Sequence, residues 1–464
     1  MSAAIASLSP SLFRPPAPVP HEAPLGLVRA IATLYRNPIE VWTRRHYEEK
    51  VLYAHTALGR NAAVCDPAGV RRIFLDNVAN YRKDARQLRI LQPALGRGLL
   101  TTDGEDWRAQ RRSLAPLFSP RQVVAFAKPM AEVMRGDVER LARQRPGRII
   151  DMHDHLARLA LEVLEHTLFT QGLGQDASGF QQAVNRYFDT IGRVDPLDLF
   201  GVPQFVPRIG RARARQPLQW FRRTVDAIIA ARRELLARGQ TPPNDILTLL
   251  LKAQDPETGL AMSENDLRAN ITTFIGAGHE TTANAMTWAL YLISQSPEWR
   301  ARAQAEADAE LNAGPIETLA ERTPVIRAIV EEAMRLYPPA AILSREAIAD
   351  DEIAGQKIPA GTTVMVAPFL LHRHRKLWRD PDAFDPDRFF GENRERIDRF
   401  AYIPFGAGPR VCIGMGFAMQ EMSIVLAHLL HAFRFDLARG HRVRPLQRVT
   451  LRPEGGMPMT LTPR

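Results

Sequence analysis

The sequence predicts a mainly α fold with a small β-rich lobe. Apolar residues recur at helical spacing through most of residues 121–314. Short runs between glycine and proline residues, at 340–367 and 442–464, are typical of short strands. The interior contains no low-complexity linker and no repeat of fixed period. We therefore expect a single domain over residues 26–464, preceded by an extended, proline-rich arm over residues 1–25.

Short elements are expected in the first 120 residues. Residues 51–64 alternate in polarity around turn residues at 59–61, which predicts a hairpin. Asp66 and Pro67 open a short helix that runs to Leu75. The other expectations here are a helix over 38–50, an irregular stretch over 77–103 and a helix over 104–118.

The longest helical pattern runs from Ser263 to Ser294, and Ser263 with Asp266 resembles a capping box at its start. A basic stretch at 208–215 is expected in a loop, either as solvated surface or as a contact with a membrane or an anionic substrate. The remaining central expectations are helices over 133–143, 156–168, 218–237 and 323–337, with the proline- and arginine-rich loop over 195–216.

Composition favours an ordinary globular protein. The chain has 464 residues, of which 45% are hydrophobic and 24% charged. It has two cysteines, so a disulfide framework is not expected, and Cys65 is predicted to be a small buried side chain. The N-terminus lacks a secretory signal, and no stretch approaches the roughly 20 apolar residues that cross a bilayer. These features predict a cytoplasmic location without a transmembrane anchor.

The formal net charge is +10, and arginine supplies nearly all of it. No aromatic–basic interleaving and no DNA-binding motif accompanies this charge, so nucleic acid is not an expected partner. Much of the arginine fits ordinary solvated surface. The more specific interpretation is a basic patch that docks an acidic protein.

Residues 405–414 (FGAGPRVCIG) are predicted to form a turn that presents one sulfur. The three glycines allow backbone conformations that are closed to other residues, and Pro409 stiffens the turn. Free amides around Cys412 can donate to its sulfur and stabilise a thiolate. A helical pattern follows, so the cysteine lies just before a helix N-terminus, which also favours negative charge.

A second polar cluster, residues 277–282 (AGHETT), lies inside the long helical pattern. Ala277 and Gly278 are small, so another group can approach the helix closely. The Thr281 hydroxyl can bond to a carbonyl in the preceding turn and loosen the helix. Ordered water then has room beside the acid Glu280 and the alcohol Thr281.

Two pairs of polar residues share helix faces elsewhere. Trp107 and Arg111 lie four apart on the 104–118 helix, which by itself also fits a core tryptophan beside a solvated arginine. Glu332 and Arg335 lie three apart and can pair, and Arg388 is a third member available from a later segment.

These motifs resemble those of the cytochrome P450 family, the haem-thiolate monooxygenases. The family's patterns for the acid–alcohol helix, E-x-x-R and W-x-x-x-R also occur, in the family's order, between Gly104 and Ser423. The resemblance implies the cytochrome P450 fold, with a haem between the long helix and the cysteine turn. The cysteine pattern F-x-x-G-x-R-x-C-x-G is filled by Phe405, Gly408, Arg410, Cys412 and Gly414.

The resemblance also implies a role for each motif residue. The cofactor is haem b, and Cys412 is its axial thiolate, which donates electron density to iron and favours O–O cleavage. Glu280 and Thr281 are the implied proton-delivery pair. Glu332, Arg335 and Arg388 are implied to be structural. The implied haem contacts are Phe405 and the propionate-binding residues Trp107, Arg111, Arg345 and Arg410.

The implied function is insertion of one oxygen atom from O2 into an apolar organic substrate. No nucleotide-binding fingerprint follows a predicted strand, so electrons are expected from a ferredoxin or flavodoxin with its reductase. Lack of an anchor resembles the soluble bacterial members. By family position the substrate pocket is lined by Phe274, Ala277, Ile342 and the region of Met457, and an acidic partner docks on Arg108, Arg111 and Arg112.

Three other functions stay open at this point. A haem-thiolate peroxygenase or isomerase would need no reductase, although such relatives usually lack the acid–alcohol pair that this chain has. A non-enzymatic haem-binding or gas-sensing protein is the second. The third is a basic nucleic-acid binder, which salt-dependent DNA affinity would reveal.

Overall fold

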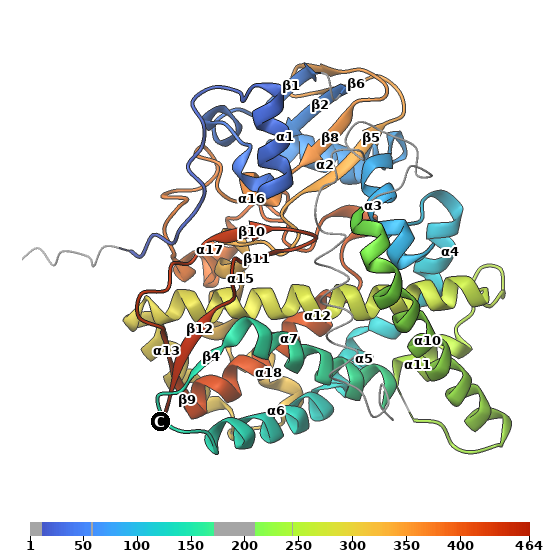
Figure 1. The fold of residues 1–464 in the computed structure, drawn as a ribbon, viewed down its shortest axis with the longest axis vertical. Helices are drawn as coiled ribbons and strands as arrows, with labels where there is room; N and C mark the ends of the chain where they lie inside the picture. Colours follow the sequence, from blue (N-terminus) through green and yellow to red (C-terminus); the bar gives the residue numbers. More distant parts are fainter. Residues whose placement is uncertain (1–11, 57–58, 171–208, 244) are drawn as a thin grey trace, which may run out of the picture.

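The computed structural model describes residues 12–56, 59–170, 209–243 and 245–464, and one long helix, α12 (Glu264–Ser294), crosses the middle of the molecule (Figure 1). The side chains of residues 282–293 are all buried, so α12 forms the axis of the hydrophobic core. The Ser263 hydroxyl accepts the Asp266 amide at 3.2 Å, which confirms the predicted cap.

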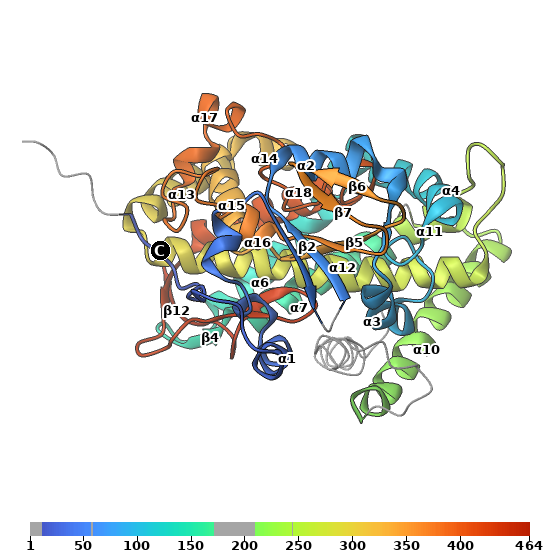
Figure 2. The same cartoon turned by 90° about the horizontal axis from the view of Figure 1, so that it is seen from above.

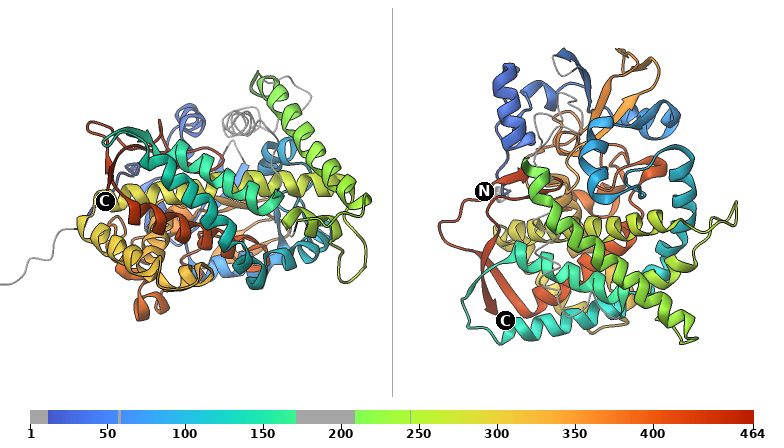
Figure 3. Two further views of the ribbon diagram at one scale, coloured as in Figure 1. Left: turned by 90° about the horizontal axis from the view of Figure 1, so that it is seen from below. Right: turned by 45° about the vertical axis from the view of Figure 1, so that its right-hand side comes forward.

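Helices from most of the chain pack around α12. Two of them, α6 and α7, run on the same side of α12 as the last helix, α18 (Figure 3). No helix among the described residues is both long and apolar enough to span a bilayer. The helices are α1 (Leu27–Arg36), α2 (Pro67–Arg71), α3 (Ala85–Leu95), α4 (Gly104–Leu114), α5 (Pro120–Ala125), α6 (Ala127–Ala142), α7 (Met152–Leu164), α10 (Ile209–Ala237), α11 (Ile246–Lys252), α13 (Pro297–Glu310), α14 (Leu319–Arg322), α15 (Pro324–Leu336), α16 (Pro368–Leu371), α17 (Gly391–Glu395) and α18 (Met415–Ala432).

The predicted β-rich lobe is a five-stranded sheet in the order β1-β2-β8-β5-β3. Figure 2 shows this lobe from above, with α12 passing beneath it. The β2–β8 pair is parallel and the other pairs are antiparallel. Its register places Lys83 opposite Arg345. The strands are β1 (Val51–Thr56), β2 (Gly59–Val64), β3 (Tyr81–Lys83), β5 (Leu343–Ala347) and β8 (Thr363–Val366).

Three smaller sheets complete the β structure of the described residues. One joins β4 and β9 on either side of β12, and two are antiparallel pairs, β6–β7 and β10–β11. The C-terminal strands predicted within 442–464 are therefore confirmed. Their bounds are β4 (Ile149–Asp151), β6 (Asp351–Ile353), β7 (Gln356–Ile358), β9 (Phe433–Leu437), β10 (Pro445–Gln447), β11 (Leu451–Pro453) and β12 (Pro458–Pro463).

The N-terminal region differs from the prediction. A helix was expected over 38–50, but the helix is α1, and only short 3-10 turns follow it. Thr43 and His46 bond to each other at 2.8 Å, which starts a separate turn and ends helical continuity. The hairpin is confirmed, but residues 59–61 lie in β2 and not in its turn.

Two stretches expected to be irregular contain helix. The helix α3 lies within 77–103, and Asp84 caps it by accepting the Arg86 amide at 3.0 Å. The expected loop at 195–216 is wrong from residue 209 onwards, because α10 begins there. Alanine and arginine are good helix formers, which suits that stretch to a helix. Residues 195–208 lie outside the described residues.

The described part of the N-terminal arm is extended and fixed to the body of the protein. Its Phe13 carbonyl accepts the Phe384 amide at 2.8 Å, and its Pro16 carbonyl accepts the Tyr337 hydroxyl at 2.6 Å. Arg14 pairs with Asp380 at 3.0 Å. The arm therefore contacts the segment that leads to the cysteine turn, and the domain boundary at residue 25 stays a prediction.

Candidate active site

The cysteine turn is present, and a close backbone crossing requires one of its glycines. Gly408 has a φ of 69°, and a Cβ there would lie 1.8 Å from the Phe74 carbonyl oxygen. Only glycine therefore fits where the turn crosses the π-helical turn Arg72–Asp76. Gly406 also has a positive φ, 76°, whereas Gly414 has a φ of −91°, which any residue can adopt.

The sulfur of Cys412 lies at the end of this turn, three residues before α18 begins. The Cys412 side chain is solvent-accessible, but the protein around it still raises the pKa of its thiol. A hydrogen bond from the Gly414 amide and the charge of Arg111 oppose that rise. One of the predicted amide donors is thus present, and a metal cation on the sulfur would add to its effect.

Three cationic side chains converge beside the turn. Arg345 is 8% exposed and donates to the Ser344 carbonyl at 2.7 Å. It forms no ion pair within the described part of the chain. Burial lowers the pKa of Arg345 to about 10, and it lowers the pKa of Lys83 to about 7. The third cation, Arg410, adds to both shifts.

One carboxylate, that of Asp103, contacts this cluster of basic residues. Asp103, the residue before α4, pairs with the Arg410 guanidinium, and its other oxygen accepts the Lys83 amide at 2.6 Å. Arg410 also donates to the Thr102 carbonyl at 3.2 Å and lies 4.1 Å over the Trp107 ring. Three basic side chains, of which Arg345 is buried and the other two are partly buried, face one carboxylate, so positive charge is in excess.

That excess is the observation that fits a haem. Two propionate carboxylates would neutralise it, and guanidinium groups bind carboxylates with a fixed fork. Arg111 lies near the Cys412 sulfur, and burial lowers the pKa of its guanidinium. The predicted residues Arg345, Arg410 and Trp107 are thus brought together. Lys83 and Asp103 were missed, because the β3–β5 pairing brings Lys83 there and contacts with Arg410 and the Lys83 amide place Asp103.

In the acid–alcohol stretch of α12, only one of the two small residues leaves room for another group, whereas the sequence suggested both. Ala277 is exposed although its neighbours Gly276 and His279 are buried. A Cβ on Gly278 would lie 3.2 Å from Leu164, so that glycine accommodates α7 and not a ligand. Ala277 is thus the residue through which another group can approach.

Thr281 makes the predicted bond, and its hydroxyl donates to the Ala277 carbonyl at 2.6 Å. The helix nevertheless continues without interruption, so the expected loosening is not seen. Glu280 is 7% exposed, and its Oε1 lies 3.8 Å from Nη1 of Arg452. Arg452 lies in β11, and no pattern in the sequence indicated it.

The predicted glutamate–arginine cluster is confirmed. Arg335 donates to both carboxylate oxygens of Glu332, at 2.6 and 2.7 Å, and neither side chain is exposed. Nε of Arg388 lies 3.6 Å from Glu332. Arg335 also donates to the His372, Pro381 and Ala383 carbonyls. These bonds hold the segment that leads to the cysteine turn.

The residues expected in the substrate pocket differ in burial, and one residue expected at the docking face is already paired within the chain. Phe274 is half-buried and packs edge-on against Phe118 at 5.3 Å, whereas the Met457 side chain is fully buried. Arg112 is held by Asp255 through two hydrogen bonds of 2.8 and 2.7 Å, so it is committed within the chain.

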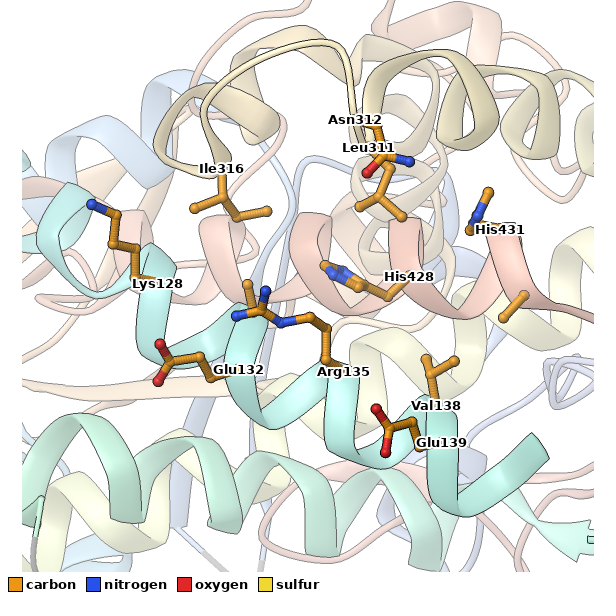
Figure 4. Close-up of a pocket in the computed structure, with 12 residues that line it drawn as sticks. Lys128, Glu132, Arg135, Val138, Glu139, Leu311, Asn312, Ile316, His428 and His431 are labelled. Carbon is orange, nitrogen blue, oxygen red and sulfur yellow. The ribbon is translucent and has the colours of Figure 1, made fainter. Parts of the chain in front are cut away.

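A surface groove of about 590 Å³ lies elsewhere, between α6, the end of α18 and the loop after α13 (Figure 4). Its apolar floor carries Lys128 and Arg135 on one side and His428 and His431 on the other. It contains none of the predicted site residues.

Comparisons with known proteins agree with this geometry. The family model described as Cytochrome P450 matches residues 40–458. The chain is 29% identical to cyclooctat-9-en-7-ol 5-monooxygenase of Streptomyces melanosporofaciens, over 93% of this chain and 92% of that protein. It is 31% identical to human cytochrome P450 4F12, over 86% and 80%.

A solved structure is similar throughout. The crystal structure of the cytochrome P450DA heme domain has a TM-score of 0.84 and 27% identity, and it covers 97% of this chain and 99% of its own. The mainly helical fold with small sheets is therefore the fold of that heme domain. The chain belongs to the cytochrome P450 family and is a monooxygenase whose haem b is carried on an axial cysteine thiolate.

Proposed function

We propose that this enzyme inserts one oxygen atom from O2 into an apolar organic substrate, by hydroxylation or epoxidation. The observation that carries the proposal is the cysteine turn beside the excess of positive charge at Lys83, Arg345 and Arg410. An acid and an alcohol in the middle of α12, Glu280 and Thr281, supply the other half of the site.

The chain's own residues would hold the haem at both ends. Cys412 would bind the iron, and the Gly414 amide would stabilise its thiolate. Arg345, Arg410 and Lys83 would bind the propionates, with the Trp107 ring against Arg410 and with Arg111 near the sulfur. A thiolate-bound haem supplies the reduction and cleavage of O2.

Glu280 and Thr281 would move protons to the reacting oxygen. The Thr281 hydroxyl donates to Ala277, so its oxygen is free to accept a hydrogen bond from water or to exchange its donor. Glu280 is buried one residue earlier, where it can pass a proton through water.

A Thr281→Ala variant tests this role against the peroxygenase alternative. We expect product per O2 consumed to fall several-fold while hydrogen peroxide rises, because proton delivery loses its order. Thr287→Ala is the matched control, since Thr287 also bonds to a carbonyl four residues back, Ala283, at 2.7 Å. Full coupling in Thr281→Ala would favour a peroxide-driven enzyme.

The substrate class rests on the chain's apolar residues and on one relative's name. Three partly buried hydrophobic residues are candidates for the pocket. Phe274 lies on α12 before the acid–alcohol stretch and packs on Phe118, and Ile342 directly precedes β5. The Streptomyces relative is named for oxidation of cyclooctat-9-en-7-ol. We infer a cyclic or chain hydrocarbon substrate with few polar groups. Binding is measurable as a spectral change of the haem on titration.

Electrons would come from a ferredoxin or flavodoxin docking beside the cysteine turn. Met415 and Val124 are exposed there, at 43% and 42%, which gives an apolar centre. Arg121 on α5 is an exposed basic residue, and Arg108 on α4 is exposed although it pairs with the exposed Glu105. Apolar centres with charged rims are typical of protein-docking faces. Arg112 is removed from the predicted set because Asp255 holds it.

A further inference from the structure

A polar cluster lies on the side of Glu280 that faces the C-terminal strands. It is formed by the start of α7, the middle of α12 and β11. The ion pair between Glu280 and Arg452 is its centre, and the two side chains are 9% and 20% exposed. The cluster comes from parts of the chain about 130 to 300 residues apart.

Arg452 is placed by contacts that tie β11 to α12. The Asn284 side-chain amide donates to the Thr450 hydroxyl at 2.9 Å, and the Trp288 indole donates to the Leu451 carbonyl at 3.3 Å. Both donors lie on α12, one and two turns beyond Glu280. The strand that carries Arg452 is therefore fixed to the helix that carries its partner.

His153 lies close enough to Arg452 for the charge of Arg452 to act on its ring. It is the second residue of α7, and Asp151 caps that helix by accepting the His153 amide at 3.0 Å. Asp151 also accepts the Met457 amide at 2.9 Å, which ties α7 to the chain just after β11. Asp151 is exposed, so this end of the cluster meets solvent.

The surroundings of His153 lower the pKa of its ring, which favours the neutral form. Burial is the largest influence that lowers the pKa of His153, and the Arg452 charge is the next. Asp151, Asn284 and Asp154 oppose them, and His279 of α12 is the remaining titratable neighbour. A neutral imidazole can accept a proton at one nitrogen and release one from the other.

We propose that Arg452 is a positioning residue that fixes the Glu280 carboxylate, and that His153 connects this pair to solvent at Asp151. This rests on the proposed role of Glu280. Each proton that Glu280 gives up is replaced by one that enters from solvent, crosses the His153 ring and reaches the carboxylate through water. No electron moves in this step, and the ring returns to its neutral form.

The first test measures the connection without turnover. In the ferrous, carbon monoxide-bound protein, which is diamagnetic, histidine titrations are read by NMR with His153→Gln for assignment. We expect Arg452→Gln to raise the pKa of His153 by about 0.5 or more, because a neighbouring positive charge is removed. Arg444→Gln, on the same hairpin but paired with Glu40 and Glu454, is the control and leaves it unchanged.

The second test measures positioning. We expect Arg452→Gln to lower product per O2 consumed by roughly threefold or more and to change the solvent isotope effect, while Arg452→Lys restores most of the coupling. His153→Gln should slow turnover with a larger solvent isotope effect. Arg444→Gln should match wild type in both.

Two outcomes would overturn the inference. One is a His153 pKa that is the same in Arg452→Gln and Arg444→Gln. The other is full coupling in Arg452→Gln with an unchanged isotope effect. A thiolate-type carbon monoxide spectrum in every variant would show that the proposed function stands while this inference fails. Loss of that spectrum in wild type would instead contradict the proposed function.

Discussion

Arg345 and Lys83 occupy facing positions on neighbouring strands, although like charges in register repel. Arg410 adds a third positive charge, and Asp103 is the carboxylate that pairs with it. Such an arrangement is costly unless an anion completes it. At the scale of single residues, this is the strongest sign in the protein chain itself that a dicarboxylate cofactor belongs there.

The residue-scale prediction concerns Arg345→Gln. We expect haem to transfer to an acceptor protein about tenfold faster or more, because a hydrogen bond to a charged partner contributes about 1.5–3 kcal/mol. The haem-free protein should not lose stability, since a buried charge without an ion pair is removed. Absorbance measures the transfer, and thermal melts measure the haem-free protein.

Arg82→Gln is the matched control, because Arg82 precedes Lys83 on β3 and pairs with Glu346 on the solvent side at 2.5 Å. Its transfer rate should equal that of wild type. Equal rates for both variants would mean that Arg345 does not bind the haem.

At the scale of single residues, the sequence predicted the site residues that lie within motifs. It missed the site residues that only contacts between distant segments bring to the site. Cys412, Glu280 and Arg335 belong to short patterns, and the structure places each on the expected element. Lys83 and Arg452 reach the site through strand contacts across hundreds of residues. A period-2 pattern in a three-residue strand is too short to reveal such partners.

Among the elements, the segment between α15 and the cysteine turn depends on one neutral histidine. Nε2 of His372 accepts the Ile403 amide at 2.9 Å, two residues before the turn begins. Burial, with the charges of Arg335 and Arg373, lowers the pKa of His372 to about 3. Protonation would break this bond and place a charge beside two arginines.

This predicts a specific loss of stability in acid. The folded pKa lies below the ordinary value of about 6.5, so the unfolded chain binds more protons between those values. The free energy of unfolding should therefore fall as pH falls from about 6.5 towards 3, by a few kcal/mol from this group. Denaturant midpoints at pH 7 and 4.5 measure it.

The His372→Asn variant should have a smaller free energy of unfolding than wild type at pH 7. That free energy should fall less on acidification than it does in wild type. The exposed His55→Gln is the control and should keep the full wild-type dependence. If His372→Asn is as acid-sensitive as wild type, another group is responsible.

Prediction of the elements succeeded where a local pattern was long and failed where contacts made on folding set the boundary. Long periodic segments such as α12 and α15 were expected within one or two residues of their ends. The helices α6, α7 and α10 begin six, four and nine residues before their predicted starts at 133, 156 and 218. The helix α3 was not predicted, and the helix expected over 38–50 is replaced by α1 and short turns. Side-chain caps at Asp84 and the Thr43–His46 contact decided those boundaries, and both depend on geometry as well as composition.

At the scale of the whole molecule, part of the net charge of +10 lies on exposed arginines of the two helices α4 and α5. Met415, at the start of the helix after the Cys412 turn, and Val124 are exposed apolar residues. Arg108 and Arg121 are exposed basic residues of α4 and α5. The Gln420 side chain of α18 donates to the Val123 carbonyl of α5 at 2.7 Å, so these two helices pack together. An acidic electron carrier would reach within a short distance of the sulfur there.

Reversing both charges tests this face. We expect Arg108→Glu with Arg121→Glu to slow reduction by an acidic ferredoxin about tenfold at low salt and to reduce its salt dependence. Stopped-flow absorbance measures the rate. Arg439→Glu, in the exposed turn after β9, is the control and should leave both unchanged. Unchanged kinetics in the double variant would place the docking face elsewhere.

The central claim is that Cys412 carries haem as a thiolate. The most direct measurement is the visible spectrum of the reduced protein with carbon monoxide. The account predicts the strongly red-shifted Soret band of thiolate-bound haem, and its loss in Cys412→Ser. A histidine-type band in freshly prepared wild type, or the same band in Cys412→Ser, would contradict it.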